Sequence, residues 1–70
     1  MSKEVGSVRA DLTLRFRDVL PETMIEMAVA AAAEELRGQV PPGAFGALLH
    51  RLAAYRLYEQ AAALGRRMNR

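Results

Sequence analysis

The chain contains no cysteine and no tryptophan, and among its 70 residues there is a single histidine. Without cysteine, disulfides and thiolate metal sites are excluded. His50 alone cannot build a metal cluster, so we expect neither a metal nor a cofactor. A domain of this length buries only about 60% of its unfolded surface, which leaves its stability marginal. Association with another chain is therefore the expected means of stabilisation.

Long apolar runs are also missing. The longest, residues 27–33, is rich in alanine and is bounded by Glu26 and Glu34. It is far shorter than the roughly 20 residues that span a bilayer. Residues 1–6 lack the apolar core of a signal peptide. We therefore expect no membrane association and a cytoplasmic location.

Charge is distributed unevenly along the chain, although the net charge is only +2. Residues 21–37 hold four glutamates and one arginine, a net −3, whereas residues 38–70 hold five arginines and one glutamate, a net +4. This arrangement suits either an anionic partner at the basic end or self-association of that end with the acidic middle.

Residues 7–19 alternate between apolar and polar side chains. The apolar positions are Val8, Ala10, Leu12, Leu14 and Phe16, and the polar positions are Arg9, Asp11, Thr13, Arg15 and Arg17. A period of two is typical of a strand with one buried face. We predict a strand over about 8–17, after a flexible tail at 1–6. The rest of the chain has helical patterns, so the backbone groups of this strand must pair with a second copy or another protein.

The middle of the chain predicts a helix over about 21–37. Its apolar stripe, spaced by three and four residues, consists of Ile25, Val29, Ala32 and Leu36. Pro21 suits the first turn of a helix, and Gly38 is placed as the residue just beyond the end.

A second helix is predicted over about 42–64, with Gly65 as its stop and residues 66–70 as a basic tail. Phe45, Leu49 and Leu52 share one face with Leu48. The apolar residues of its second half lie about half a turn away, and these are Ala54, Leu57, Ala61 and Leu64. Our interpretation is that the first half packs within the chain and the second half reaches another subunit. Residues 7–65 would thus form one domain of strand, helix, helix order.

Candidate catalytic groups are few. His50 could act as a general base, but no serine, cysteine or aspartate stands at a suggestive spacing, which favours a partly buried helix histidine. Glu34 and Glu35 are adjacent and would point about 100° apart on a helix, so they do not form an acid/base pair. We predict no enzymatic activity.

The polar face of the predicted strand carries Arg9, Arg15 and Arg17 beside Thr13. Paired antiparallel with its copy, this face would present a narrow ribbon of arginines that fits the major groove of DNA. The alternative is a charged outer face that keeps a half-buried sheet soluble. Asp11, in the middle of the face, would repel phosphate.

The order of strand, Leu20-Pro21-Glu22, helix, Gly38 turn and helix resembles the ribbon-helix-helix repressors and antitoxins over about residues 8–58. The resemblance implies a mainly α-helical fold with one N-terminal strand. Two chains would form an intertwined homodimer with a two-stranded antiparallel ribbon. The outward residues that would read DNA bases are Arg9, Asp11, Thr13, Arg15 or Arg17.

Two functions follow as hypotheses for a small dimeric interaction module. The first is a DNA-binding transcriptional regulator or antitoxin that contacts double-stranded DNA through Arg9, Thr13, Arg15 and Arg17. The alternative is an accessory or assembly subunit that binds a larger protein through its strand and its long second helix. The expected interface residues are Leu12, Leu14, Phe16, Ala54, Leu57, Ala61 and Leu64.

Overall fold

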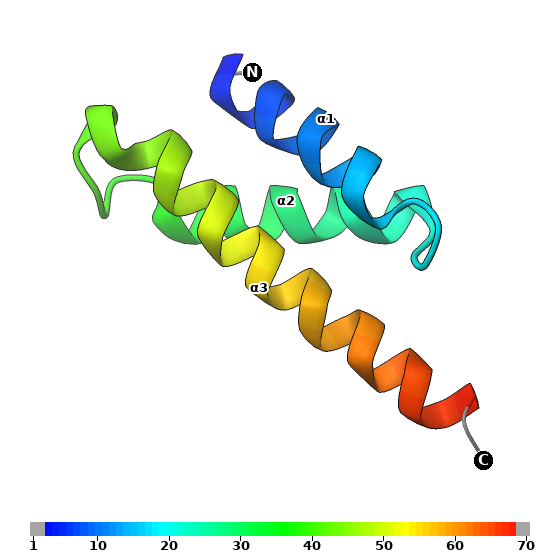
Figure 1. Ribbon diagram of the computed structural model, residues 1–70. Coiled ribbons are helices and arrows are strands. Elements are labelled where there is room, and N and C mark those ends of the chain that lie inside the picture. Colours follow the sequence, from blue (N-terminus) through cyan, green and yellow to red (C-terminus); the bar gives the residue numbers. More distant parts are fainter. Residues whose placement is uncertain (1–2, 69–70) are drawn as a thin grey trace.

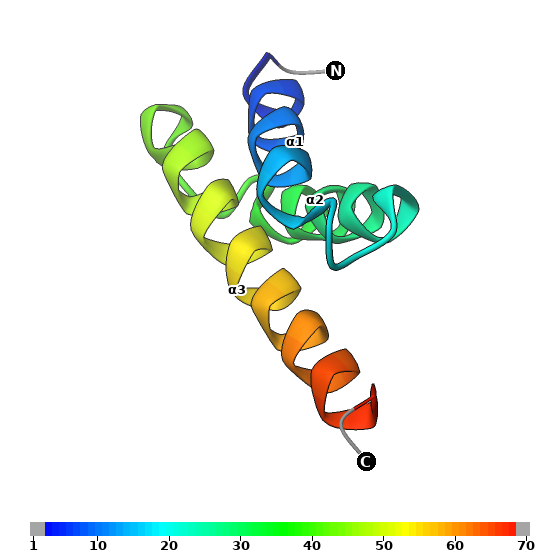
Figure 2. The same ribbon diagram turned by 45° about the vertical axis from the view of Figure 1, so that its right-hand side comes forward.

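The computed structural model describes residues 3–68, and this part of the chain forms three helices and no strand (Figure 1). Helix α1 spans Lys3–Phe16, α2 spans Glu22–Leu36 and α3 spans Pro42–Met68. Both α1 and α2 lie against α3, and the C-terminal end of α3 projects beyond them (Figures 1 and 2).

One row of α3 side chains forms the centre of the core. Leu49, Ala53 and Leu57 are each 0% exposed and follow one another at intervals of four, so they lie on one side of the helix. The other buried residues come from α1, α2 and the connection between them, and these are Val8, Leu12, Phe16, Leu20, Ile25, Ala28, Val29, Ala32 and Ala33. All twelve core residues are apolar, and the described part of the chain buries no polar side chain.

The predicted N-terminal strand is wrong, because residues 8–16 belong to helix α1. The buried residues of α1 are Val8, Leu12 and Phe16. Residues four apart lie on the same face of a helix and also on the same face of a strand, so this spacing fits both. Leu14, which the strand would have buried beside them, is 68% exposed. A helix pairs its backbone groups within itself, so this segment needs no partner chain for its hydrogen bonds.

Because residues 3–68 contain no strand, the predicted βαα order, the two-stranded ribbon and the intertwined dimer built on that ribbon are wrong as well. Residues 3–6, predicted as a flexible tail, form the first turn of α1. Helix α3 does not stop at Gly65 but continues to Met68, so residues 66–68 of the predicted basic tail are helical. Residues 1–2 and 69–70 lie outside the described part of the chain.

The two connections, residues 17–21 and 37–41, are built alike. Three backbone hydrogen bonds recur at a shift of 20 residues. In the first connection, Arg17 N donates to Thr13 O (2.9 Å), Val19 N to Phe16 O (2.9 Å) and Met24 N to Pro21 O (3.1 Å). The equivalent bonds of the second connection run from Arg37 N to Ala33 O (3.0 Å), from Gln39 N to Leu36 O (2.9 Å) and from Ala44 N to Pro41 O (3.0 Å). Each connection ends in a proline, whose extended conformation stops one helix pattern before the next begins. The chain thus uses one type of turn twice.

The hydrophobic residue before each proline distinguishes the two connections. Leu20 is 3% exposed and joins the core, whereas Val40 is half-buried at the edge of a groove. Gly38 adopts a φ of 75°, the left-handed conformation that favours glycine after a helix.

Two glycine substitutions test the backbone conformations at Gly6, inside α1, and at Gly38, in the connection after α2. Gly6 lies inside α1, and a Cβ built there meets no atom within 4 Å. Gly6→Ala should therefore raise the free energy of unfolding by about 0.5–1 kcal/mol. Gly38→Ala should lower it by about 1–2 kcal/mol, because alanine disfavours a positive φ. Urea unfolding followed by circular dichroism measures both, and the absence of a gain for Gly6→Ala would contradict a helix at that position.

Candidate functional site

The four residues predicted to contact DNA do not form one basic surface. Arg9 and Arg15 are six residues apart on α1, which places them about 120° apart around the helix. Arg9 and Thr13 line a shallow groove that they share with Glu22 and Glu26 of α2. Arg15 pairs with Asp11, and Arg17 stands in the connection after α1. Acidic side chains therefore adjoin three of the four predicted contact residues, Arg9, Thr13 and Arg15.

The predicted interface residues fall into three groups. Leu12, Phe16 and Leu57 are buried in the core of their own chain. Ala54, Ala61 and Leu64 are half-buried and pack against that core. Leu14 is exposed.

The apolar face of α3 changes direction between the first and second halves of the helix, and packing within the chain explains this change. A row of residues spaced by four drifts by about 40° around a helix at every step. The row that runs through Leu49, Ala53 and Leu57 can thus follow an inclined neighbour, and burial of Leu57 requires no second subunit.

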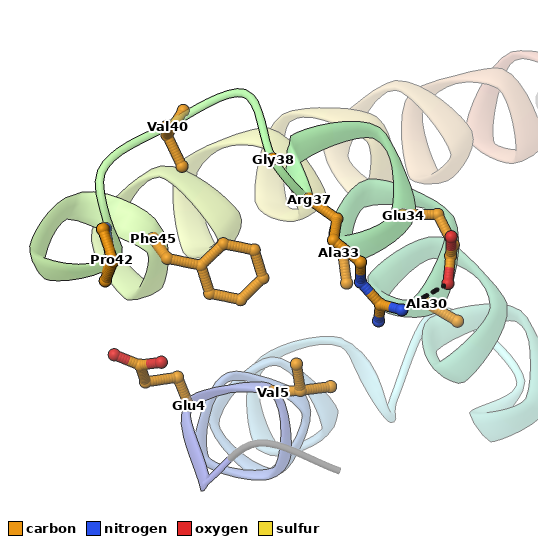
Figure 3. A pocket seen from close by; sticks show the side chains of 10 residues that line it. All are labelled: Glu4, Val5, Ala30, Ala33, Glu34, Arg37, Gly38, Val40, Pro42 and Phe45. Atoms are coloured by element: carbon orange, nitrogen blue, oxygen red, sulfur yellow. Dashed lines mark ion pairs between the residues drawn. The ribbon is translucent and has the colours of Figure 1, made fainter.

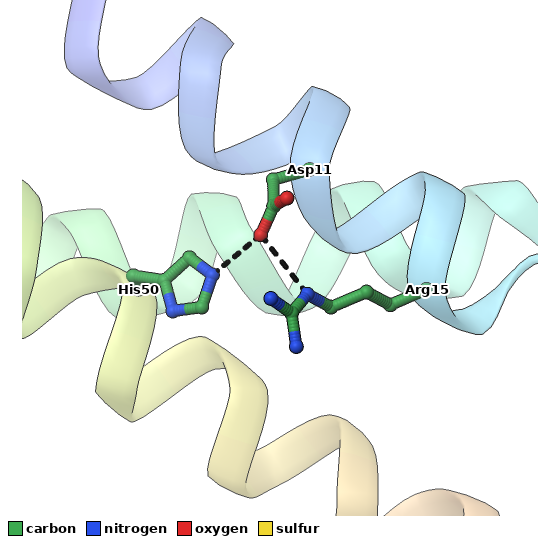
Figure 4. Close-up of polar contacts among 3 residues, drawn as sticks. All are labelled: Asp11, Arg15 and His50. Atoms are coloured by element: carbon green, nitrogen blue, oxygen red, sulfur yellow. Dashed lines mark hydrogen bonds and ion pairs between the residues drawn. The ribbon is translucent and has the colours of Figure 1, made fainter.

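A polar cluster joins α1 to α3 on the molecular surface (Figure 4). Asp11 Oδ2 lies 2.7 Å from His50 Nε2 and 3.2 Å from Arg15 Nε. Arg15 is one helical turn after Asp11, whereas His50 reaches across from α3 (Figure 4). Sequence reasoning missed the Asp11–His50 pair because the two residues are 39 positions apart and Asp11 was placed on a strand.

The hydrogen bond with His50 and the positive charge of Arg15 lower the pKa of Asp11 from its ordinary value of 3.8. Ser7 lines the same shallow hollow as Asp11 and His50, but within the described residues it makes no hydrogen bond to the imidazole. The cluster therefore acts in this geometry as a surface link between two helices.

Two further contacts align α1 with α3 on the same side as His50. A Cβ built at Gly46 would lie 3.4 Å from Glu4 Cγ, at van der Waals contact, so α3 and the start of α1 are close neighbours here. The rings of Phe16 and Tyr58 meet edge to face, with centroids 4.9 Å apart. Gly46, His50 and Tyr58 share one row of α3 at multiples of four residues.

An apolar groove opens where the N-terminal end of α1 meets the end of α2 and the start of α3 (Figure 3). It has a volume of about 580 Å³. Val5 and the ring of Phe45 lie in it, and the ion pair between Arg37 and Glu34 (3.3 Å) stands at its rim (Figure 3). Its apolar lining can accept a hydrophobic side chain.

A second groove lies between α2 and α3, and we call it the α2–α3 groove. It has a volume of about 490 Å³ and is lined by Pro21, Thr23, Met24, Met27, Ala28, Ala31, Arg56 and Gln60. Met27 is 70% exposed, the largest exposed fraction among the large hydrophobic residues described. Arg56 is held at the edge of the groove by an ion pair with Glu35 at 2.6 Å. The two α3 residues of its lining, Arg56 and Gln60, come from the second half of that helix.

Comparison of the chain with protein-family models, curated proteins and solved structures found no match. None of the described helices combines the length and the hydropathy needed to cross a bilayer. Residues 3–68 also contain no group of three or more histidine or acidic side chains arranged to hold a metal ion.

The Asp11–His50 link predicts a specific pH dependence. The lowered pKa means that the contribution of Asp11 to stability is fully present above about pH 3.8 and is lost as the pH falls through the pKa of the folded state. Asp11→Asn should lower the thermal midpoint at pH 6 and reduce the loss of stability on acidification. Thermal unfolding between pH 2.5 and pH 6 measures this effect, with Asp18→Asn in the α1–α2 connection as the control. Equal acid sensitivity of Asp11→Asn and the unmodified chain would contradict the link.

Proposed function

We propose that the chain is a small non-enzymatic protein-binding module, an accessory or assembly subunit that binds a helix in the α2–α3 groove. The proposal is supported by the α2–α3 groove and by the length of α3, which exceeds that of either neighbouring helix. Met27 in the groove and Ala62 and Ala63 on α3 are exposed apolar residues that the core of the chain does not bury.

The helix lengths give the size of the projection. At 1.5 Å per residue, the 27 residues of α3 extend about 40 Å, whereas the 14 and 15 residues of α1 and α2 extend about 21–23 Å. Helix α3 is thus about 17 Å longer than either neighbour. Ala61 and Leu64, in its second half, still pack against the core of their own chain. Because helices gain most of their stability from tertiary packing, such a projecting segment favours a partner.

The lining of the α2–α3 groove suits a helix as its occupant. Met24 and Met27 have flexible, polarisable side chains that adapt to differently shaped partners. Ala28 and Ala31 are small and permit a close approach of backbones. Gln60 supplies a polar group at the edge that can fix the orientation of a bound helix. An amphipathic helix laid in a hydrophobic groove is a recurrent mode of protein recognition.

Of the two functions predicted from the sequence, DNA binding depended on a ribbon that does not form, and we do not propose it. The alternative depended partly on the long last helix, which is the feature that supports protein binding here.

Site-specific photocrosslinking tests the proposal. A photoreactive amino acid at Met27 should yield discrete covalent adducts with a protein in cells that produce the chain. The control is the same amino acid at Tyr55, which is 60% exposed but lines none of the grooves described. We expect the photoreactive amino acid to form adducts when it is placed at Met27 and to form none when it is placed at Tyr55. The absence of adducts at both positions would contradict a protein-binding groove.

A further inference from the structure

The surface of the chain is larger than that of a compact monomer of its mass. The accessible area is 5106 Å², whereas a folded monomer of 7.7 kDa is expected to expose about 4,300 Å². The excess of about 800 Å² equals the area that one partner buries in a protein–protein interface of standard size. The radius of gyration, 12.6 Å against an expected value of about 11 Å, shows the same elongation. The elongated shape thus exposes more surface than a compact chain of this mass and leaves room for an interface of standard size.

The charges of the two helices beside the groove are complementary. Helix α2 carries four glutamates and no basic residue, whereas α3 ends in the basic sequence that begins at Arg66 and Arg67. Within one chain, an arginine of α3 already pairs with a glutamate of α2, since Arg56 lies 2.6 Å from Glu35. A basic helix end placed along α2 would be attracted in the same way.

The projecting half of α3 also has the shape that the groove requires. Gln60, Ala63 and Leu64 fall on one side of the helix, within an arc of about 100°. Ala63 is exposed, whereas Leu64 is half-buried against the core of its own chain, so this side offers a small apolar surface centred on Ala63. Gln60 belongs both to this side and to the lining of the groove. The α2–α3 groove and the helix side that fits it are therefore adjacent on the same face of the chain.

We propose that the occupant of the α2–α3 groove is the projecting half of α3 from a second copy of this chain. The two α3 helices run antiparallel about a two-fold axis near Gln60, and each places its basic end beside the acidic α2 of the other copy. Such a contact is self-complementary, as a two-fold interface must be, and it assembles α2 and α3 of both copies into a four-helix arrangement. This inference rests on the proposed function and names its partner.

Sedimentation equilibrium of the purified full chain tests the inference. The unmodified chain should have twice the mass of its 7.7 kDa monomer. Met27→Glu alters the groove, and Ala63→Glu places a carboxylate on α3 where it would face the glutamates of α2. Each should raise the dimer dissociation constant by at least about 100-fold, which is the size of effect expected at the centre of an interface. The matched control, Tyr55→Glu, should change the constant by less than about threefold.

Circular dichroism of each variant separates loss of association from loss of folding, because all three substitutions are at exposed helix positions and should leave the helix content unchanged. A monomer at all concentrations up to 1 mM, or a Met27→Glu chain that dimerises as well as the unmodified one, would overturn the second copy as occupant. Adducts from Met27 to a different protein would overturn it as well, while leaving the protein-binding function in place. A monomeric chain that also gives no adduct would overturn both.

Discussion

The structure depends on the burial of one row of α3 side chains, Leu49, Ala53 and Leu57. Helices of 14 and 15 residues, such as α1 and α2, are marginal in isolation, so both need an apolar surface on which to pack. The row on α3 supplies that surface to both at once. Because the core described here contains no polar side chain, its apolar packing is non-directional, and the relative orientation of the helices is left to contacts outside the core.

Those outer contacts lie on the two sides of the buried row and tie α3 to one neighbour each. On one side His50 bonds to Asp11 of α1, and on the other Arg56 pairs with Glu35 of α2. Both are partly exposed pairs, whose value lies in alignment more than in stability. With its neighbours aligned over its first half, α3 projects as a helix in a defined direction. That projection connects the fold to the proposed function, because it is the segment that we propose to occupy the α2–α3 groove of a second copy.

The sequence predicts the two later helices closely. Their apolar residues are spaced by three and four, and Pro21, Gly38 and Pro42 mark where the helices begin or end. It misleads in the N-terminal segment because Val8, Leu12 and Phe16, spaced by four, satisfy the periods of a helix and a strand alike. Leu14, which is exposed on the helix, adds a further apolar residue at the spacing of two that is typical of a strand. The Asp11–His50 link and the α2–α3 groove were beyond prediction, because both depend on how residues far apart in sequence are brought together by helix crossing.

The helical state of α1 and its packing on α3 of the same chain can be measured by nuclear magnetic resonance. The observables are the Cα chemical shifts of residues 7–16 and nuclear Overhauser contacts between the rings of Phe16 and Tyr58. We expect helical shifts throughout and a ring contact that persists within one chain in samples mixing labelled and unlabelled protein. Extended shifts, with backbone contacts between residues 8–17 of different chains, would contradict it and restore the ribbon.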